Sequence, residues 1–190
     1  MIRYVLSFFS LLSALAVVAN AQAADDHDHK HEPVAIKDAV CILVPMKASG
    51  VNGTILLKQE KGYARVSGEI TGLKQGKHGF HIHMFGDLRA PDGMSVGGHY
   101  NPHGHPHGGV ESKERHEGDL GNIEADAKGV AKFDIKADHV VLNDIVGRSL
   151  VVHGDADDLK SQPAGNAGPR IAVGVIGMAE VKAPATATKK

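Results

Sequence analysis

The chain has 190 residues, a length that fits one domain together with a targeting sequence. Its 21 basic residues nearly balance 22 acidic ones, so it lacks the excess positive charge with which nucleic-acid-binding proteins meet phosphates. It contains a single cysteine, Cys41, which excludes an intrachain disulfide. It also contains 13 histidines, which are the main candidates for functional residues.

Residues 1–23 are expected to be a cleaved signal peptide. Arg3 supplies a short positive segment, Val5 to Val18 is almost continuously apolar, and Ala21-Gln22-Ala23 has the small-x-small pattern that signal peptidase recognises. The apolar stretch is shorter than the ~20 residues of a membrane-spanning helix, and polar sequence follows it directly. We therefore expect an exported protein, periplasmic or extracellular, without a membrane span once the signal is removed.

The two ends of the mature chain lack the pattern of a folded core. Residues 24–38 are polar and rich in histidine, and we expect them to form a disordered arm. Its three closely spaced histidines are His27, His29 and His31. A role of this arm as a copper donor is left open. Residues 183–190 are mainly Ala, Thr and Lys and are expected to form a flexible tail, which leaves 39–182 as the folded domain.

Between these ends, short apolar or alternating segments are separated by glycine-rich turns, which is the pattern of β-strands. In the clearest case, Thr54–Gln59 and Tyr63–Ile70 flank a Lys61-Gly62 turn as the two arms of a hairpin. The predicted strands are 39–46, 54–59, 63–70, 79–84, 119–124, 130–136, 149–153 and 171–181. No long segment has a helical period. This pattern predicts an all-β protein, an eight-stranded antiparallel Greek-key sandwich or barrel of immunoglobulin-like architecture.

Two long stretches do not fit strands and are expected to be functional loops, Gly86–Gly118 and Gly154–Pro169. Eight of the 13 histidines fall between His78 and His116, in and before the first of these loops. Chance clustering of exposed histidines is the alternative. The spacing of these residues argues against it, because it brings metal-ligating side chains together.

His81 and His83 are separated by one residue in a predicted strand, so both side chains point to one face and can reach one ion. His153 ends another apolar strand, and it adds a third imidazole if that strand lies beside the first. Imidazole suits copper and zinc. The first loop and the strand after it supply four further ligand-type residues: His99, His107, His116 and Asp119. Three imidazoles and a carboxylate are a suitable ligand set for tetrahedral zinc.

Several longer segments form a recognisable pattern. They are Gly79-Phe80-His81-Ile82-His83-Met84-Phe85-Gly86-Asp87, Gly98-His99-Tyr100-Asn101-Pro102, His107-Gly108-Gly109, Arg115-His116-Glu117-Gly118-Asp119-Leu120-Gly121-Asn122, Val152-His153 followed by Ala156-Asp157-Asp158, and Gly165-Asn166-Ala167-Gly168-Pro169-Arg170. In this order they resemble the metal-binding and active-site segments of copper–zinc superoxide dismutases. The resemblance covers the chain from about Ala39 to Val181.

The resemblance implies one copper ion and one zinc ion per subunit. The copper ligands that it implies are His81, His83, His99 and His153. The zinc ligands that it implies are His99, His107, His116 and Asp119, so that His99 bridges the two ions. Asp157 corresponds to a carboxylate that links a copper-ligand histidine to a zinc-ligand histidine, the alternative being one of three acids on a solvated loop. Arg170 corresponds to an arginine that attracts and holds the superoxide anion, against the alternative of a surface arginine.

The activity that the resemblance implies is conversion of two superoxide anions and two protons to oxygen and hydrogen peroxide by Cu(II)/Cu(I) cycling, with His99 also a proton donor. The alternative is an exported copper-binding or delivery protein on the same fold without turnover. The presence of every ligand and of Arg170 favours the enzyme. A homodimer is left open, because the predicted strands show no decisive interface patch.

The sequence departs from the family at the disulfide that usually ties the long loop to the last strand. The loop position lies in Gly93-Met94 and the strand position is Val173, and neither holds a cysteine. Cys41 is expected to be a small core residue instead. We therefore expect zinc to be the main clamp on this loop.

The two long loops contain few basic residues near Arg170 and two further histidines. The loop after His153 is short, and Lys160 is its only basic residue before Arg170. Because basic residues attract an anion to a site, this shortage bears on the rate of the reaction and not on which reaction takes place. His103 and His105 flank the expected zinc ligands. We expect them to be solvent-exposed loop residues, with spare ligands as the alternative.

Overall fold

Eight β-strands, a 3₁₀ turn and a four-residue helix make up the regular structure of residues 34–180, which are the residues that the computed structural model describes. They belong to a compact unit that begins at Ala35. The predicted signal peptide, most of the predicted arm and the predicted tail lie outside the described residues. Within the described residues, no helix is long and apolar enough to cross a membrane.

The strands match the predicted segments closely. They are β1 (Asp38–Pro45), β2 (Asn52–Glu60), β3 (Tyr63–Thr71), β4 (Gly76–His83), β5 (Asp119–Ala125), β6 (Ala131–Asp138), β7 (Ser149–His153) and β8 (Arg170–Met178). The largest difference at a strand start is in β4, which begins at Gly76 instead of Gly79 because Gly76 pairs with Ala125 of β5. The helix α1 (Leu142–Ile145) is a single turn between β6 and β7.

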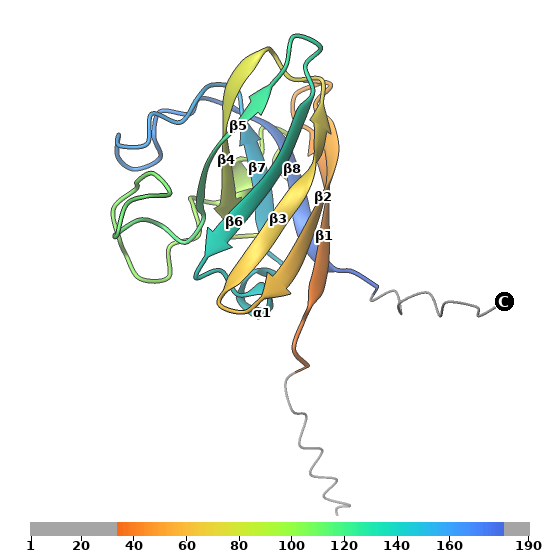
Figure 1. The fold of residues 1–190 in the computed structure, drawn as a ribbon. Helices are drawn as coiled ribbons and strands as arrows, with labels where there is room; N and C mark the ends of the chain where they lie inside the picture. Colours follow the sequence, from red (N-terminus) through yellow and green to blue (C-terminus); the bar gives the residue numbers. More distant parts are fainter. Residues whose placement is uncertain (1–33, 181–190) are drawn as a thin grey trace, which may run out of the picture. The chain divides into compact units, whose positions relative to one another are not determined.

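All strand pairs are antiparallel, in the order β5-β4-β7-β8-β1-β2-β3-β6. The two end strands, β5 and β6, also contact each other, so the sheet curls into a nearly closed barrel (Figure 1). The predicted hairpin is present, since β2 and β3 pair up to Glu60 and Tyr63 on either side of the Lys61-Gly62 turn. The predicted all-β sandwich or barrel is confirmed.

The barrel interior is filled by alternate side chains from every strand. Each strand contributes apolar residues such as Ile55, Val66, Phe80, Leu150 and Ile176, all of them fully buried. Side chains at alternate positions of a strand face the same side, so these residues leave the neighbouring positions pointing outward. The predicted core position of Cys41 is confirmed, because its side chain is buried and burial raises the pKa of the thiol to about 12.

The two long loops run between β4 and β5 and between β7 and β8, and both lie on the same side of the barrel in Figure 1. They cover the outer face of β4 and β7, whose residues are buried on both faces of the sheet for most of their length. A face of this kind must be covered by other parts of the chain, and the loops with their histidines are what covers it.

Candidate metal centre

The strand β4 divides its side chains between the core and the loops. Phe80 and Ile82 point into the barrel, whereas His81 and His83 lie on the opposite face, and all four are buried. β7 pairs directly with β4, which places His153, the last residue of β7, next to these two imidazoles. The predicted convergence of the three histidines therefore follows from strand alternation and strand pairing.

The first long loop brings His99 onto the same surface. Its backbone docks on β4 through an isolated bridge between His83 and His99, and the Tyr100 N–H donates to the Ile82 carbonyl over 2.7 Å. Gly118 is required by this close approach, because a Cβ at that position would lie 2.3 Å from the Ile82 carbonyl oxygen. A substituted residue there would push the loop away from the strand.

One group of four histidines converges beneath the loops: His81, His83, His99 and His153. One nitrogen from each ring lies within 4.8 Å of the others, and all four residues are buried. The Nε2 atoms of His83 and His153 are 3.4 Å apart. Two nitrogens bound at about 2.0–2.1 Å to one ion in tetrahedral geometry lie roughly 3.3 Å apart, so this separation is that of two ligands of one metal.

The hydrogen bonds of these rings fix which nitrogen faces the shared centre. His83 donates from Nδ1 to the Gly97 carbonyl over 2.9 Å, and His153 donates from Nδ1 to the Gly168 carbonyl over 3.2 Å. Carbonyl oxygens only accept, so the hydrogen is on Nδ1 and the lone pair is on Nε2 in both rings. His81 is the reverse case, because its Nε2 donates to a carboxylate and leaves Nδ1 free. Each ring thus presents a lone pair to the centre.

A second group lies directly beside the first and consists of His99, His107, His116 and Asp119. The Oδ1 atom of Asp119 is 2.7 Å from Nδ1 of His99, 3.0 Å from Nδ1 of His107 and 3.2 Å from Nδ1 of His116. The Nδ1 atoms of His99 and His116 are 3.4 Å apart. His99 belongs to both groups, with Nδ1 directed at the second and Nε2 left for the first.

Buried ring nitrogens without hydrogen-bond partners indicate that these two groups fit metal ions. Three buried ring nitrogens have no hydrogen-bond partner within the described residues: Nδ1 of His81, Nε2 of His99 and Nδ1 of His107. A buried polar atom without a partner costs about 1–3 kcal/mol, and an ion at each centre would remove this cost. Four imidazoles suit copper, and three imidazoles with one carboxylate suit zinc.

Burial and the neighbouring carboxylates set the charge of the rings. Burial lowers the pKa of His99 to about 4 and that of His153 to about 3, so both rings are neutral and ready to bind a cation at neutral pH. Burial also opposes the charged form of His107, but the adjacent carboxylates of Asp119 and Asp157 outweigh it and raise the pKa of His107 to about 9. The same contacts hold the pKa of both carboxyls well below its usual range, despite their burial.

Asp157 connects the two groups from behind. Its Oδ2 accepts from Nε2 of His81 over 2.9 Å, and its Oδ1 accepts from Nε2 of His107 over 3.0 Å. The backbone of Asp157 is held by the side-chain amide of Asn122, which donates to its carbonyl and accepts from its N–H. A carboxylate that accepts the outer N–H of a ligand histidine fixes the orientation of the ring. Asp157 is buried, so the alternative of a solvated acid is excluded.

Gln162 is a residue of this centre that sequence reasoning missed. Its side-chain amide accepts from the N–H of His107 and donates to the carbonyl of His107, each over 2.8 Å. This two-way contact fastens the second loop to a member of the second group. The only sequence signal is a single glutamine in a loop that is short for the family, which does not identify a role.

Removing this contact is expected to weaken binding at the second group. Gln162→Met keeps the length of the side chain but removes both hydrogen bonds, so zinc affinity should fall by about 10–100-fold, the range seen when a supporting contact to a metal ligand is lost. Competition with a chromogenic zinc chelator measures it. The matched control is Gln75→Met, because Gln75 is exposed. Equal zinc affinity in the two variants would show that Gln162 has no part in the centre.

Arg170 lies at the start of β8 next to the first group. Its guanidinium donates to the carbonyls of Gly93 and Gly97, each over 2.5 Å, and the Gly97 carbonyl is also the acceptor for His83. The side chain is half-buried, and burial lowers its pKa, although an arginine of this kind remains charged at neutral pH. A cationic group therefore lies beside the first group and ties the loop to the barrel.

Apolar packing occupies the position of the missing disulfide. A Cβ on Gly93 would lie 3.0 Å from Cγ2 of Val173, so the two positions face each other as the family pattern implies. Val173 forms a small buried cluster with Met46, Val96 and Val151. This cluster, together with the Arg170 contacts, gives the first loop an anchor on the barrel that does not need a metal ion.

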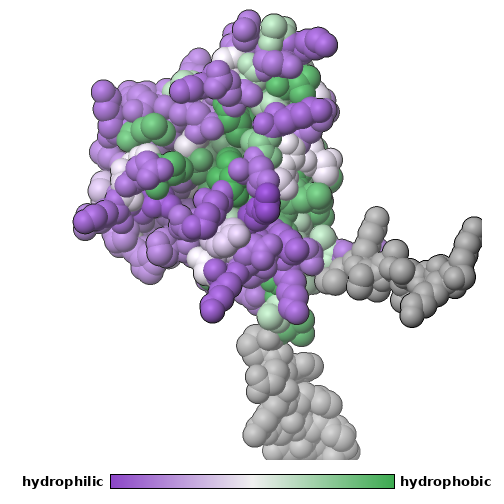
Figure 2. Space-filling model, viewed as in Figure 1, coloured by the Kyte–Doolittle hydropathy of each residue, from purple (hydrophilic) through white to green (hydrophobic). Residues whose placement is uncertain are grey.

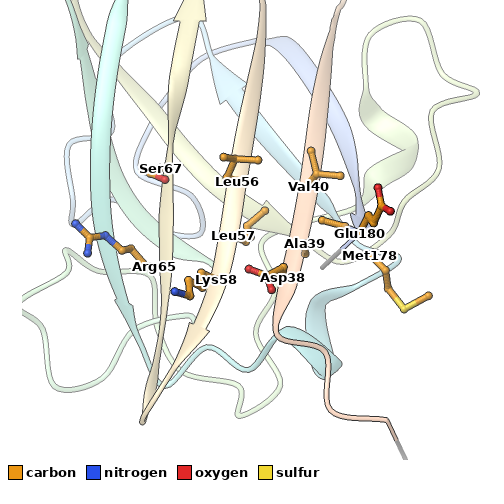
Figure 3. Close-up of a pocket in the computed structure, with 11 residues that line it drawn as sticks. Asp38, Ala39, Val40, Leu56, Leu57, Lys58, Arg65, Ser67, Met178 and Glu180 are labelled. Carbon is orange, nitrogen blue, oxygen red and sulfur yellow. The ribbon is translucent and has the colours of Figure 1, made fainter. Parts of the chain in front are cut away.

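One pocket lies away from the histidines. It has a volume of about 670 Å³ and is lined by residues of β1, β2 and β3 and by the segment from Met178 to Glu180 (Figure 3). Val40 and Leu56, which are paired across β1 and β2, provide apolar walls. No ligand-type cluster lies in this pocket, so we place the chemistry at the histidine groups and treat the pocket as part of the outer face of the barrel.

Comparison with known proteins gives three findings. The family model described as copper/zinc superoxide dismutase (SODC) matches residues 51–176. The extracellular superoxide dismutase [Cu-Zn] of Brugia pahangi is 46% identical over 153 residues, covering 74% of this chain and 76% of that protein. The crystal structure of the clock protein EA4 is 36% identical with a TM-score of 0.72, and the match covers 78% of this chain and 99% of that one.

Proposed function

This chain belongs to the copper/zinc superoxide dismutase family, and we propose that its two histidine groups divide the two metals between them, with copper at the first group and zinc at the second. The protein is an oxidoreductase that converts superoxide to oxygen and hydrogen peroxide and uses copper and zinc. The observation that supports the division of the metals is the donor set of each group, together with the membership of His99 in both. The dismutase activity is tested by the inhibition of cytochrome c reduction in a superoxide-generating assay, with protein of known metal content.

When bound, copper supplies the one-electron redox chemistry on which dismutation depends. The chain provides what surrounds it. His81, His83 and His153 hold their rings by hydrogen bonds that leave one lone pair each for the ion. We assign to Nε2 of His99 one of the two protons that formation of hydrogen peroxide consumes, which this nitrogen would carry only while it is not a metal ligand, because it is buried, faces the first group and has no protein partner among the described residues. The second group and Asp157 orient that ring and its neighbours.

Arg170 is the residue that we propose to attract and hold the superoxide anion. Its charged guanidinium shares the Gly97 carbonyl with His83, so it lies one hydrogen-bonded residue away from the copper group. A charge-assisted hydrogen bond from an arginine is stronger than one between neutral groups. The guanidinium is also held in place by two backbone carbonyls, which reduces the cost of ordering it when the anion arrives.

The Arg170→Ala variant is expected to retain both metals but to show a kcat/KM lower by about 10-fold or more, because one charge-assisted contact worth ~1.5–3 kcal/mol is lost. Arg170→Lys should recover part of the rate at low salt, since it restores the charge. The control is Arg89→Ala, which removes an exposed arginine of the first long loop that pairs with Asp87. Kinetics of Arg170→Ala equal to those of Arg89→Ala at low ionic strength would assign the guiding role to another base.

We further propose a second copy of this chain as the partner of the outer face of β8, β1 and β2. Exposed apolar side chains gather there, including Leu56, 56% exposed, and Met178, 69% exposed. Figure 2 shows hydrophobic surface over the region of β1 and β2 in a face that is otherwise mostly hydrophilic. Exposed apolar patches of this kind are typical of interfaces. Sedimentation of the wild type and of a Leu56→Lys variant tests the proposal, which fails if both sediment as the same species.

Export is proposed on the amino-terminal sequence, with support from the relative named as extracellular. The mature protein would begin near Ala24, and amino-terminal sequencing of the secreted protein checks this position. The three histidines of the arm, spaced two residues apart, offer imidazoles that suit copper, and we propose that the arm captures copper for the enzyme.

A further inference from the structure

The turn between β1 and β2 has a strained backbone. It comprises residues Met46 to Ser49, and the Ser49 N–H donates to the Met46 carbonyl over 3.0 Å to close it. Its two central residues are Lys47 and Ala48, with φ of +46° and +57°. This left-handed region favours glycine, and neither of the two is a glycine. Strain of this kind persists only where the surrounding structure enforces it, and it is concentrated at functional sites.

Hydrogen bonds hold this turn between β8 and the first long loop. On one side, the Met46 N–H and the Ser49 hydroxyl both donate to the carbonyl of Ile171, over 2.9 Å and 2.6 Å. On the other side, the Lys47 N–H donates to the carbonyl of Pro91 over 3.3 Å. The turn is thus fastened both to the start of β8 and to the first long loop.

These contacts place the charge of Lys47 beside Arg170. The β8 residue that holds the turn directly follows Arg170. On the loop side, Nζ of Lys47 lies 4.0 Å from Oδ2 of Asp92. Asp92 directly precedes Gly93, whose carbonyl accepts from the Arg170 guanidinium. A pair of opposite charges therefore lies next to the residue that we propose to hold the anion.

The charge of Asp92 acts on Arg170. Burial lowers the pKa of the guanidinium, and the negative charge of Asp92 opposes this effect. The field of the carboxylate thus reaches the guanidinium, and it must also repel an anion that approaches the same group. Oδ1 of Asp92 accepts from the Met94 N–H over 3.0 Å, which holds the carboxylate in place. Its side chain is 41% exposed, so salt in the solvent screens its charge.

Lys47 is placed to offset this repulsion. Its positive charge balances the negative charge of Asp92, so an approaching anion meets the field of Arg170 undiminished. The side chain of Lys47 is 68% exposed, and an exposed ion pair contributes little to the stability of a fold, so stability does not account for the pair. Between His153 and Arg170, Lys160 is the only base. Lys47 therefore supplies from another part of the chain a positive charge that the short second loop lacks.

We propose that Lys47 and Asp92 together set the attraction of the superoxide anion to Arg170, with Lys47 as a further guiding base and Asp92 as the charge that it offsets. The inference rests on the proposed role of Arg170 in holding the anion. It gives a purpose to the strained turn, which brings a base next to the start of β8 from outside the two long loops.

The dependence of kcat/KM on ionic strength, measured by pulse radiolysis on protein loaded with both metals, tests the proposal. Lys47→Gln should lower kcat/KM about 2-fold at low salt, the effect of one unit charge at roughly 10 Å in water. Asp92→Asn, which keeps an acceptor for the Met94 N–H, should raise it by a similar factor. The double variant carries neither charge and should return close to the parent. All differences should vanish at about 1 M salt, where the screening length is ~3 Å.

Lys132→Gln and Glu69→Gln are the matched controls, because each breaks another exposed ion pair, which joins β6 to β3. Both should have the kcat/KM of the parent at every salt concentration. Equal kcat/KM in Lys47→Gln, Asp92→Asn and the controls would overturn the proposal. Changes that persist at high salt, or that do not cancel in the double variant, would also overturn it, because they would indicate a distorted loop rather than a lost charge.

Arg170→Ala is measured in the same series, so that the two proposals can be separated. A kcat/KM equal to that of the parent in this variant would refute the proposed role of Arg170. A reduced kcat/KM in Arg170→Ala, with no effect of Lys47→Gln or Asp92→Asn, would leave that role standing and would overturn only the role of the pair.

Discussion

The His83→Ala variant is expected to lose turnover and to bind copper much more weakly, while its zinc content remains close to that of the parent. His83 belongs to the first group alone, and its Nε2 lies 3.4 Å from that of His153, where two ligands of one ion would lie. The residue is fully buried, and burial lowers the pKa of the ring well below its usual value, so it is neutral and available to a cation. No other side chain of the first group can replace its lone pair.

Metal content by mass spectrometry and dismutation activity, measured on the same preparation, check this result. His139→Ala is the control, because it removes an exposed histidine that lies outside both groups. Full activity in His83→Ala would refute the copper assignment of the first group. Equal loss of copper and zinc would indicate that His83 holds the fold together rather than one metal.

Removing zinc is expected to lower the melting temperature by about 10 °C or more. Binding that requires the folded state stabilises it, by ~4 kcal/mol at a thousand times the dissociation constant, and 1 kcal/mol corresponds to about 2–4 °C for a chain of this size. The second group is built from the first loop and the start of β5, so one ion fastens several separate points of the chain. The apolar cluster of Met46, Val96, Val151 and Val173 remains after stripping and should keep the barrel folded.

Reductant should not change the melting temperature. The chain has one cysteine, Cys41, which is buried and unpaired. Protein loaded with zinc alone is the proper sample, because the reductant then has no copper to act on. Melting curves with and without reductant should coincide, and the curve of the stripped protein should lie well below both. If the zinc-free protein has the same melting temperature as the zinc-loaded protein, packing alone holds the first long loop on the barrel.

The strands and the arrangement around β4 could be predicted from the sequence because each follows from a short-range rule. Alternation predicts that His81 and His83 share a face, and strand pairing then brings in His153. The expectation of two adjacent groups that share His99 came from the resemblance to the family and not from the order of the residues alone. The long loops were recognisable as segments without a strand pattern.

The supports behind the ligands could not be predicted, because they depend on contacts between segments far apart in the sequence. Gln162 holds the backbone of His107 across 55 positions, and Asn122 holds Asp157 across 35. A glutamine or asparagine in a loop has no pattern that names its partner. The packing of Val173 against the first loop is a further case, since a missing cysteine says only that a disulfide is absent.

The sharing of His99 by the two groups is the central claim, and magnetic coupling between two metals tests it most directly. The protein is loaded with Cu(II) at the first group and Co(II) at the second, and the copper signal is measured by electron paramagnetic resonance. An imidazole that binds both ions couples their unpaired electrons, so the copper signal should be strongly reduced in this protein compared with the copper–zinc form. A copper signal that is the same in both forms, with both ions shown to be present, would contradict the shared ligand.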